Sequence, residues 1–373
     1  MNNQSIPVNV PLLSGNEKLY VNECIDSGWI SSEGPFVERF ERELSDRVNR
    51  SHGVAVANGS AALDVAVAAL GIQEGDEVIL PSHTIISCAL SIVRAGATPV
   101  LIDSEMSTWN MDVNLIEEKI TNKTKAIMAV HVYGFPLDMD KVLSLAKKYK
   151  LYVIEDAAQM LGQTYKGKPC GSFGDISTFS FYPNKQITTG EGGMCLTNNV
   201  GLAERCRSFR NLCFKKEQRF VHEELGWNYR MSNLQAALGV AQLENLDKHV
   251  EKKRHVGNLY NSLISGSSNF SMSPAKMGYA NNIYWVVGIL LSGDCGFLAV
   301  DIMKKLTERS IGTRPFFYPL HLQPVLNKMD LFLGESYPIS EELSQRGFYL
   351  PSGLGISDKE IERSADALVQ VLK

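Results

Sequence analysis

Short apolar runs alternate with amphipathic segments over about residues 50–196. The runs at 52–57, 76–81, 97–103, 125–134, 151–156 and 176–181 are rich in β-branched and other apolar residues, which predicts strands. Between them, residues 60–71 and 138–150 repeat apolar positions at a helical period. Strands that are apolar on both faces and joined by helical crossovers indicate a mostly parallel sheet covered by helices. Such sheets bind ligands at the carboxyl ends of their strands.

The pattern changes after residue 232. Residues 233–264 predict one long helix with a solvated charged face. Beyond it we expect a strand at 284–291, a helix near 299–309 and a closing helix from about 357. We therefore predict two domains, a large one over 1–250 and a smaller C-terminal α+β domain over 251–373.

Composition excludes several classes of partner. The net charge of −4 over 373 residues offers no electrostatic reason to expect nucleic acid or an anionic membrane. Seven scattered cysteines without a C-x-x-C pair suit a reducing compartment and argue against a disulfide framework or a zinc site, so we expect no metal. Residues 1–15 lack the features of a signal peptide, and no stretch has the roughly 20 apolar residues of a membrane span. We expect a cytoplasmic protein.

Two strand ends carry candidate ligand-binding groups. Asn58, Gly59 and Ser60 leave one strand and open a helix, whose free N–H groups can hold a phosphate. A capped helix without a ligand explains the same residues, and alone it is the commoner case. Glu155 and Asp156 end another strand on opposite faces, so only one of them can face the ligand side. Helix capping by the aspartate is an equal alternative.

A third strand end leads to Lys185, within STFSFYPNKQITTGEGGM at 177–194. A desolvated lysine can lose its proton near neutral pH and attack a carbonyl to form a Schiff base. Most lysines are solvated surface residues, but the small residues at 188–193 leave room for a ligand. In the segment 226–239, Asn228 and Arg230 are either ordinary residues at the start of a helix or residues that bind an anion. An amine, a buried carboxylate and a phosphate cradle together match the needs of pyridoxal 5′-phosphate.

Longer motifs carry a family resemblance over nearly the whole chain. They include SGWISSEGPFVERFE, NGSAALDVAVAALG, VIEDAAQ, GSFGDISTFSFYPNKQITTGEGGM, NYRMSNLQAALGVAQLE and RPFFYPLH. The sequence resembles the sugar-nucleotide aminotransferases of the DegT/DnrJ/StrS family. The resemblance implies an α/β fold of the fold-type-I aspartate-aminotransferase type and a pyridoxal-phosphate-dependent transaminase. It is greatest to members that aminate GDP-4-keto-6-deoxymannose with L-glutamate, which implies a role in surface polysaccharide or O-antigen biosynthesis.

The resemblance also implies roles for single residues. Lys185 would be the catalytic residue that bonds to the cofactor aldehyde, Asp156 would bind the pyridinium nitrogen, and Gln159 would lie against the ring. Asn228 would reach the phosphate from the neighbouring subunit of a homodimer with shared active sites. The phosphate would otherwise be held by Gly59, Ser60 and Ser180. Substrate contacts are expected at Trp29, Ser31, Arg314 and His321.

Two positions depart from the family pattern. Ile85 stands where an aromatic side chain usually stacks on the cofactor ring, so either the isoleucine covers the ring or His83 takes over part of that task. Tyr182-Pro183 replaces a Phe-Gly pair and bears on the choice of sugar.

Three other functions stay open from the sequence. The chain could aminate another nucleotide sugar, linked to UDP or dTDP and carrying its keto group at C4 or C3. Some related sugar dehydratases replace the lysine with histidine, and this chain keeps Lys185, which favours transamination. A non-catalytic sugar-binding or regulatory protein has little reason to keep the lysine, the aspartate and the phosphate-site serines together.

Overall fold

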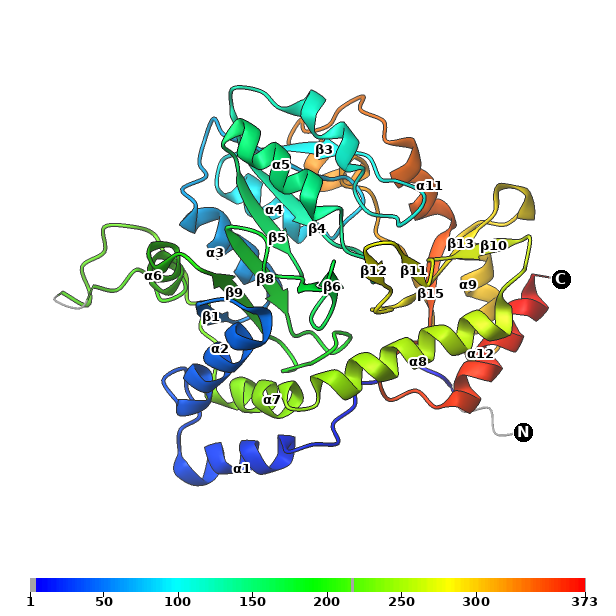
Figure 1. Ribbon diagram of the computed structural model, residues 1–373, viewed down its shortest axis with the longest axis horizontal. Coiled ribbons are helices and arrows are strands. Elements are labelled where there is room, and N and C mark those ends of the chain that lie inside the picture. Colours follow the sequence, from blue (N-terminus) through cyan, green and yellow to red (C-terminus); the bar gives the residue numbers. More distant parts are fainter. Residues whose placement is uncertain (1–4, 216–217, 373) are drawn as a thin grey trace.

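The computed structural model describes residues 5–215 and 218–372. Its largest sheet within these residues is a central one of seven strands (Figure 1). The strand order is β1-β9-β8-β5-β4-β2-β3. Neighbours from β8 to β3 are parallel, and β9 runs antiparallel to both β1 and β8. The expected α/β fold with a mostly parallel sheet is confirmed. Its strands are β1 (His52–Val56), β2 (Glu77–Pro81), β3 (Thr98–Ile102), β4 (Thr124–Val130), β5 (Tyr152–Asp156), β8 (Ile176–Ser180) and β9 (Gly193–Thr197).

Helices cover both faces of this sheet because successive strand side chains point to opposite sides. In β1, Val54 and Val56 belong to one buried apolar cluster and Ala55 belongs to another. The first cluster contains side chains of α3 (Gly59–Ala69), α4 (Ser87–Arg94) and α6 (Val200–Phe209). The second contains side chains of α1 (Glu17–Ser27), α2 (Pro35–Val48), α5 (Met139–Tyr149) and α7 (Asn233–Leu243).

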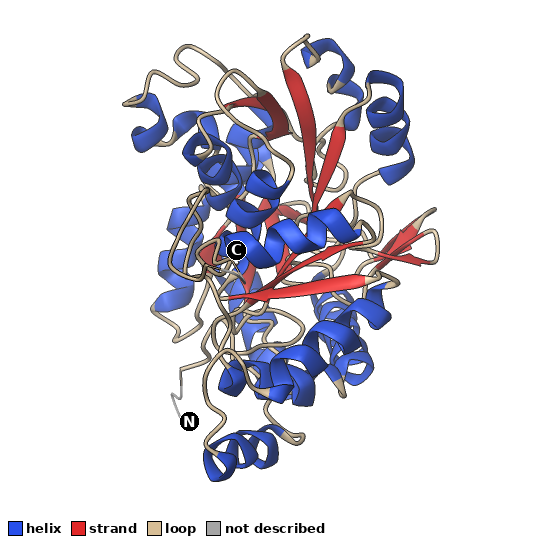
Figure 2. Ribbon diagram, turned by 90° about the vertical axis from the view of Figure 1, so that its left-hand side faces the viewer, coloured by secondary structure: helices blue, strands red, loops and turns tan. Residues whose placement is uncertain are grey.

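The C-terminal part has its own sheet, whose strands are drawn in red in Figure 2 with those of the central sheet. It also has its own apolar core. Within the described residues this sheet has the order β10-β13-β15-β14 and is antiparallel throughout. Its elements are α8 (Leu246–Ile264), β10 (Phe270–Met272), β13 (Val287–Leu291), α9 (Ala299–Thr307), β14 (Arg314–Pro315), α10 (Pro324–Asn327), α11 (Pro338–Arg346), β15 (Gly347–Leu350) and α12 (Asp358–Val371). Two small hairpins pair β6 (Thr164–Tyr165) with β7 (Lys168–Pro169) and β11 (Lys276–Met277) with β12 (Ala280–Asn281).

The boundary at residue 250 stays a prediction. Helix α8 passes through that position, and Ile6 from the start of the chain packs in the C-terminal core. Ile6 also forms a bridge with Ile311. In the stretches 5–215 and 218–372, no helix is both long and apolar enough to cross a membrane.

The expectation of one helix over 233–264 is wrong, because α7 and α8 are separated at Glu244 and Asn245. The amide of Asn245 bonds to the carbonyl of Gln242, three residues back, which interrupts the helical hydrogen-bond ladder. The chain resumes at the buried Leu246. The break lets α7 pack on α2 while α8 packs on α12 (Figure 1).

Candidate active site

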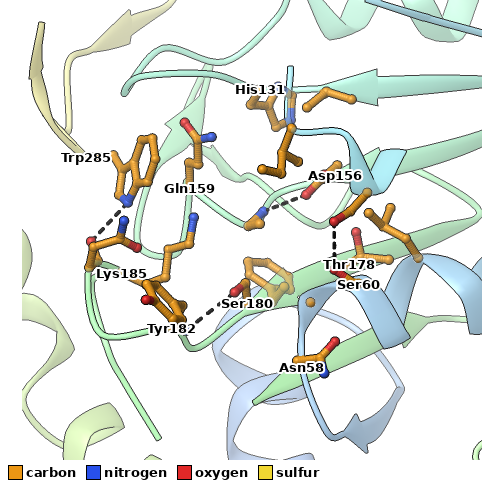
Figure 3. Close-up of a pocket in the computed structure, with 18 of the residues that line it drawn as sticks. Asn58, Ser60, His131, Asp156, Gln159, Thr178, Ser180, Tyr182, Lys185 and Trp285 are labelled. Carbon is orange, nitrogen blue, oxygen red and sulfur yellow. Dashed lines mark hydrogen bonds between the residues drawn. The ribbon is translucent and has the colours of Figure 1, made fainter. Parts of the chain in front are cut away.

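A cavity of about 530 Å³ opens at the carboxyl ends of the parallel strands. It receives side chains from the ends of β5 and β8, from the start of α3 and from the segment before β13 (Figure 3). A pocket at this edge is expected of an open α/β sheet. Of the residues predicted to bind the cofactor, the lining includes Gly59, Ser60, Ile85, Asp156, Gln159, Ser180 and Lys185. Their individual roles remain predictions.

Lys185 reaches the cavity from the loop that follows β8. Its Nζ atom lies 4.1 Å from the centroid of the Trp285 ring. Burial lowers the pKa of Lys185 to about 8, although the negative charge of Asp156 acts in the opposite direction. About one tenth of the amine is therefore uncharged and nucleophilic at pH 7, far more than at the ordinary lysine pKa of about 10.4.

Asp156 ends β5 and is almost completely buried at the cavity. Its Oδ1 accepts a hydrogen bond from the backbone N–H of Ala158 at 3.0 Å, and its Oδ2 accepts one from the thiol of Cys88 at 3.4 Å. Burial raises the pKa of Asp156 above its ordinary value, against these two bonds and the charge of Lys185. No helix begins in residues 157–163, so the helix-capping alternative does not apply.

Glu155 points to the opposite face, as strand alternation requires. Its carboxylate accepts hydrogen bonds from the ring of His131 at 3.2 Å and from the hydroxyl of Ser177 at 3.1 Å. It also accepts bonds from the backbone N–H groups of Gly171, Phe173 and Gly174. Burial alone would raise the pKa of Glu155, but these bonds outweigh it and the pKa lies below its usual value. Glu155 is therefore a structural anion behind the cavity.

The start of α3 forms a cradle of small and hydroxyl-bearing residues. The side chain of Asn58 caps the helix by accepting from the N–H of Ala61 at 2.9 Å. A Cβ atom on Gly59 would lie 2.8 Å from the Cβ of Ser180, so only glycine fits there. The hydroxyl of Ser60 lies 2.7 Å from that of Ser87.

Several predicted contacts lie away from this cavity. Trp29, Ser31 and Asn228 are exposed on the chain's surface. Arg314 lines an adjoining cavity. His321 is buried, with its Nδ1 2.8 Å from the Ser82 hydroxyl and its Nε2 3.1 Å from Glu341. All five assignments stay predictions.

At the first departure from the family pattern, the two candidate side chains lie in different surroundings. Ile85 lines the cavity and is 43% exposed. His83 is buried outside the lining, among the rings of Tyr133, Phe316 and Phe317. Neither ring nitrogen of His83 has a hydrogen-bond partner in the described chain, and burial lowers its pKa to about 3. Ile85 rather than His83 therefore lies at the cavity, and its contact with a cofactor ring stays a prediction.

Several residues of the lining were not expected from the sequence, among them Trp285, Thr178 and His131. Trp285 comes from the segment before β13, and its motif YWVVGILL signals only a strand. Thr178 is paired in register with Asp156 across β5 and β8, and its buried hydroxyl has no hydrogen-bond partner in the described chain. His131 follows β4 and donates to Glu155. Of these three residues, only Thr178 could have been found from the sequence, because it lies in a predicted strand two residues before Ser180 and so shares a face with it.

The lining fits pyridoxal 5′-phosphate. The unpartnered hydroxyl of Thr178 is a buried group that a ligand can satisfy, and the cradle at Gly59 leaves space where a side chain would stand. Asp156 has few donors around its carboxylate, which leaves it able to accept from a pyridinium N–H. The N-terminus of α3 and nearby hydroxyls suit a phosphate.

Comparisons with known proteins show the family of the chain. The DegT/DnrJ/EryC1/StrS aminotransferase family profile matches residues 11–369. GDP-perosamine synthase of Escherichia coli O157:H7 is 44% identical over 356 residues, covering 95% of each chain. The putative pyridoxal phosphate-dependent aminotransferase EpsN of Bacillus subtilis is 37% identical over 375 residues, covering 99% of this chain and 96% of EpsN. The solved structure of DesV from S. venezuelae superposes with a TM-score of 0.88 at 31% identity, covering 96% of this chain and 94% of DesV. The chain therefore belongs to the DegT/DnrJ/EryC1/StrS aminotransferase family.

Proposed function

We propose that the chain transfers the amino group of L-glutamate to the keto carbon of a nucleotide-linked 6-deoxysugar, with GDP-4-keto-6-deoxymannose as substrate and GDP-perosamine as product. As a member of its family it is a pyridoxal 5′-phosphate-dependent transaminase. The observation that carries the transfer is the meeting of Lys185 and Asp156 in one cavity. The sugar is supported by the 44% identity to a GDP-perosamine synthase over 95% of both chains.

The side chains of the cavity suit this reaction. When bound, the cofactor supplies an electron-withdrawing ring that stabilises the carbanion formed at the carbon losing its proton. The amine of Lys185 would move that proton, and burial, which lowers its pKa to about 8, would keep it effective near neutral pH. The carboxylate of Asp156 would hold the ring N–H. The ring of Trp285 lies against the amine and reduces the access of water to it.

The proposal includes a cytoplasmic homodimer with shared active sites that supplies an amino sugar for a surface polysaccharide such as O-antigen. Exposure of Asn228, Trp29 and Ser31 supports the dimer, because a residue that serves a second subunit must lie on the surface. Phe220 and Leu225 are also strongly exposed apolar residues near Asn228 in the chain, at 80% and 93%. All seven cysteines are free thiols, which suits a reducing compartment.

The test is a substrate panel. Purified protein loaded with cofactor is incubated with L-glutamate and GDP-, UDP- and dTDP-linked keto-6-deoxysugars, and products are identified by mass spectrometry and NMR. Amination of GDP-4-keto-6-deoxymannose at C4 is the expected result. Amination of only UDP- or dTDP-sugars would overturn the GDP assignment. Loss of a sugar hydroxyl without transfer of nitrogen would indicate a dehydratase, and binding without any product would indicate a sugar-binding protein.

A further inference from the structure

A second cavity, of about 180 Å³, adjoins the first. Tyr182, Asn184, Trp285 and Tyr349 line both cavities. Two cationic side chains also line the second one, Lys253 from α8 and Arg314 from β14, and none of the described residues around it is acidic. The two cations come from elements far apart in the sequence, so only the folded chain brings them together.

Lys253 is a buried lysine without an anionic partner in the described chain. Its side chain is 1% exposed, and its Nζ donates to the backbone oxygens of Trp285 at 2.9 Å and Ser352 at 2.6 Å. Over the described chain, neither Lys253 nor Arg314 forms an ion pair. Burial and the nearby charge of Lys185 lower the pKa of Lys253 to about 7. Near neutral pH the amine is therefore about half protonated, and an anion in the cavity would favour its charged form.

Trp285 connects this pair of cations to the reacting amine. The Nζ of Lys185 lies over its ring, and the Nζ of Lys253 donates to its backbone oxygen. The two lysine nitrogens therefore contact the same residue, one at its side chain and the other at its backbone. The second cavity has room for a carboxylate on a short aliphatic stem, whereas a nucleotide is far larger than its volume.

We propose that Lys253 and Arg314 form a carboxylate subsite that holds one end of a dicarboxylate amino donor while its amino group lies beside Lys185. This inference rests on the proposed function and adds to it a structural reason for a donor with two carboxylates. The guanidinium supplies a forked pair of donors for the carboxylate, and the ammonium supplies the N–H that its two carbonyl partners leave free. The pyrophosphate of the nucleotide sugar is the other anion present, so the test must separate the two.

The main variant is Arg314→Gln, because the side chain of Arg314 is exposed and makes no hydrogen bond within the described chain, so its loss should not affect folding. We expect the KM for L-glutamate to rise roughly tenfold or more, with the KM for the nucleotide sugar unchanged. The preference for L-glutamate over L-glutamine should fall by a similar factor. Lys253→Met should act in the same direction. Lys252→Met, on the same helix in a surface ion pair with Asp358, is the matched control.

A second readout does not depend on the sugar. Glutarate and butanoate are titrated into cofactor-free protein by calorimetry, and the visible spectrum of the loaded protein is followed as glutamate is added alone. We expect tighter binding of glutarate than of butanoate, with the difference lost in Arg314→Gln. If no nucleotide sugar is aminated, the proposed function fails, but the binding of glutarate and butanoate still tests the carboxylate subsite. An unchanged KM for glutamate in Arg314→Gln, or a raised KM for the sugar instead, overturns the subsite.

Discussion

The Nζ atom of Lys185 lies 4.1 Å from the centroid of the Trp285 ring. The indole N–H of Trp285 also donates to the backbone oxygen of Asn184 at 3.0 Å. One aromatic residue from the C-terminal part therefore covers the lysine and holds the loop that carries it. This contact gives the small C-terminal sheet a direct part in shaping the cavity.

Replacing Trp285 tests that contact. Trp285→Phe keeps an aromatic face but loses the N–H bond to Asn184, and we expect kcat/KM to fall roughly tenfold. Trp285→Leu also loses the aromatic face, so its kcat/KM should be lower still. Trp227→Phe is the control, because Trp227 stacks on Tyr229 outside the cavity. Equal activities for all three variants would rule out this role.

Lys185→Ala should abolish steady-state turnover, because no other side chain in the cavity supplies the amine. Its thermal midpoint should stay close to that of the unaltered protein, since the Lys185 side chain makes no hydrogen bond in the described chain. The measurements are product formation and thermal unfolding. Borohydride trapping with peptide mapping on the unaltered protein should label Lys185, and turnover retained in the variant would refute its role.

Capture of the cofactor should depend on pH. The pKa of Lys185 in the fold is about 8, so the uncharged amine that bonds to the aldehyde increases as the pH rises through that value. The rate at which cofactor-free protein develops visible absorbance should therefore rise with an inflexion near pH 8. An inflexion near the ordinary lysine value, roughly 10.4, would contradict the proposed desolvation. Lys185→Ala should show no such absorbance.

Gly59→Ala should weaken cofactor binding. The added Cβ would lie 2.8 Å from the Cβ of Ser180, so the cradle must distort or lose its space. We expect the dissociation constant for pyridoxal phosphate to rise roughly tenfold, which corresponds to about 1.4 kcal/mol. Gly278→Ala is the control, because a Cβ atom added there would meet no other atom within 4 Å. Both constants can be measured by fluorescence titration.

Glu155→Gln should destabilise the fold. Whichever way it turns, the amide would place donor hydrogens against backbone N–H groups, either those of Phe173 and Gly174 or that of Gly171, and it would remove a buried anion from His131. We expect a loss of about 3 kcal/mol in the free energy of unfolding, measured in urea. Asp140→Asn, at an exposed ion pair with Lys166, should leave the midpoint unchanged.

The stabilising effect of Glu155 also has a pH signature. Its pKa is lower in the folded chain than in the unfolded one, so its contribution is present above the unfolded value of about 4.3. The contribution is lost as the pH falls through the folded pKa. The difference in stability between the unaltered protein and Glu155→Gln should therefore narrow on acidification. A constant difference across that range would contradict the assignment.

Much of the candidate site could be placed from sequence because its residues stand at strand ends. Parallel strands bring their carboxyl ends to one edge, so residues that follow β1, β5 and β8 meet there whatever lies between them. Strand alternation also separated Asp156 from Glu155. The break between α7 and α8 could not be seen, because Glu244 and Asn245 continue a helical polar pattern and the interruption depends on packing of Leu246.

The sequence by itself determined the parallel sheet, the lysine, the aspartate and the cradle at the start of α3, since local periodicity and strand alternation dictate where those side chains point. Only the tertiary structure decided that Trp285 covers Lys185 and that Lys253 and Arg314 line one cavity. These pairs join segments whose distance along the chain carries no signal of proximity. The first pair depends on how the C-terminal part packs against the central sheet, and the second depends on how α8 packs within the C-terminal core.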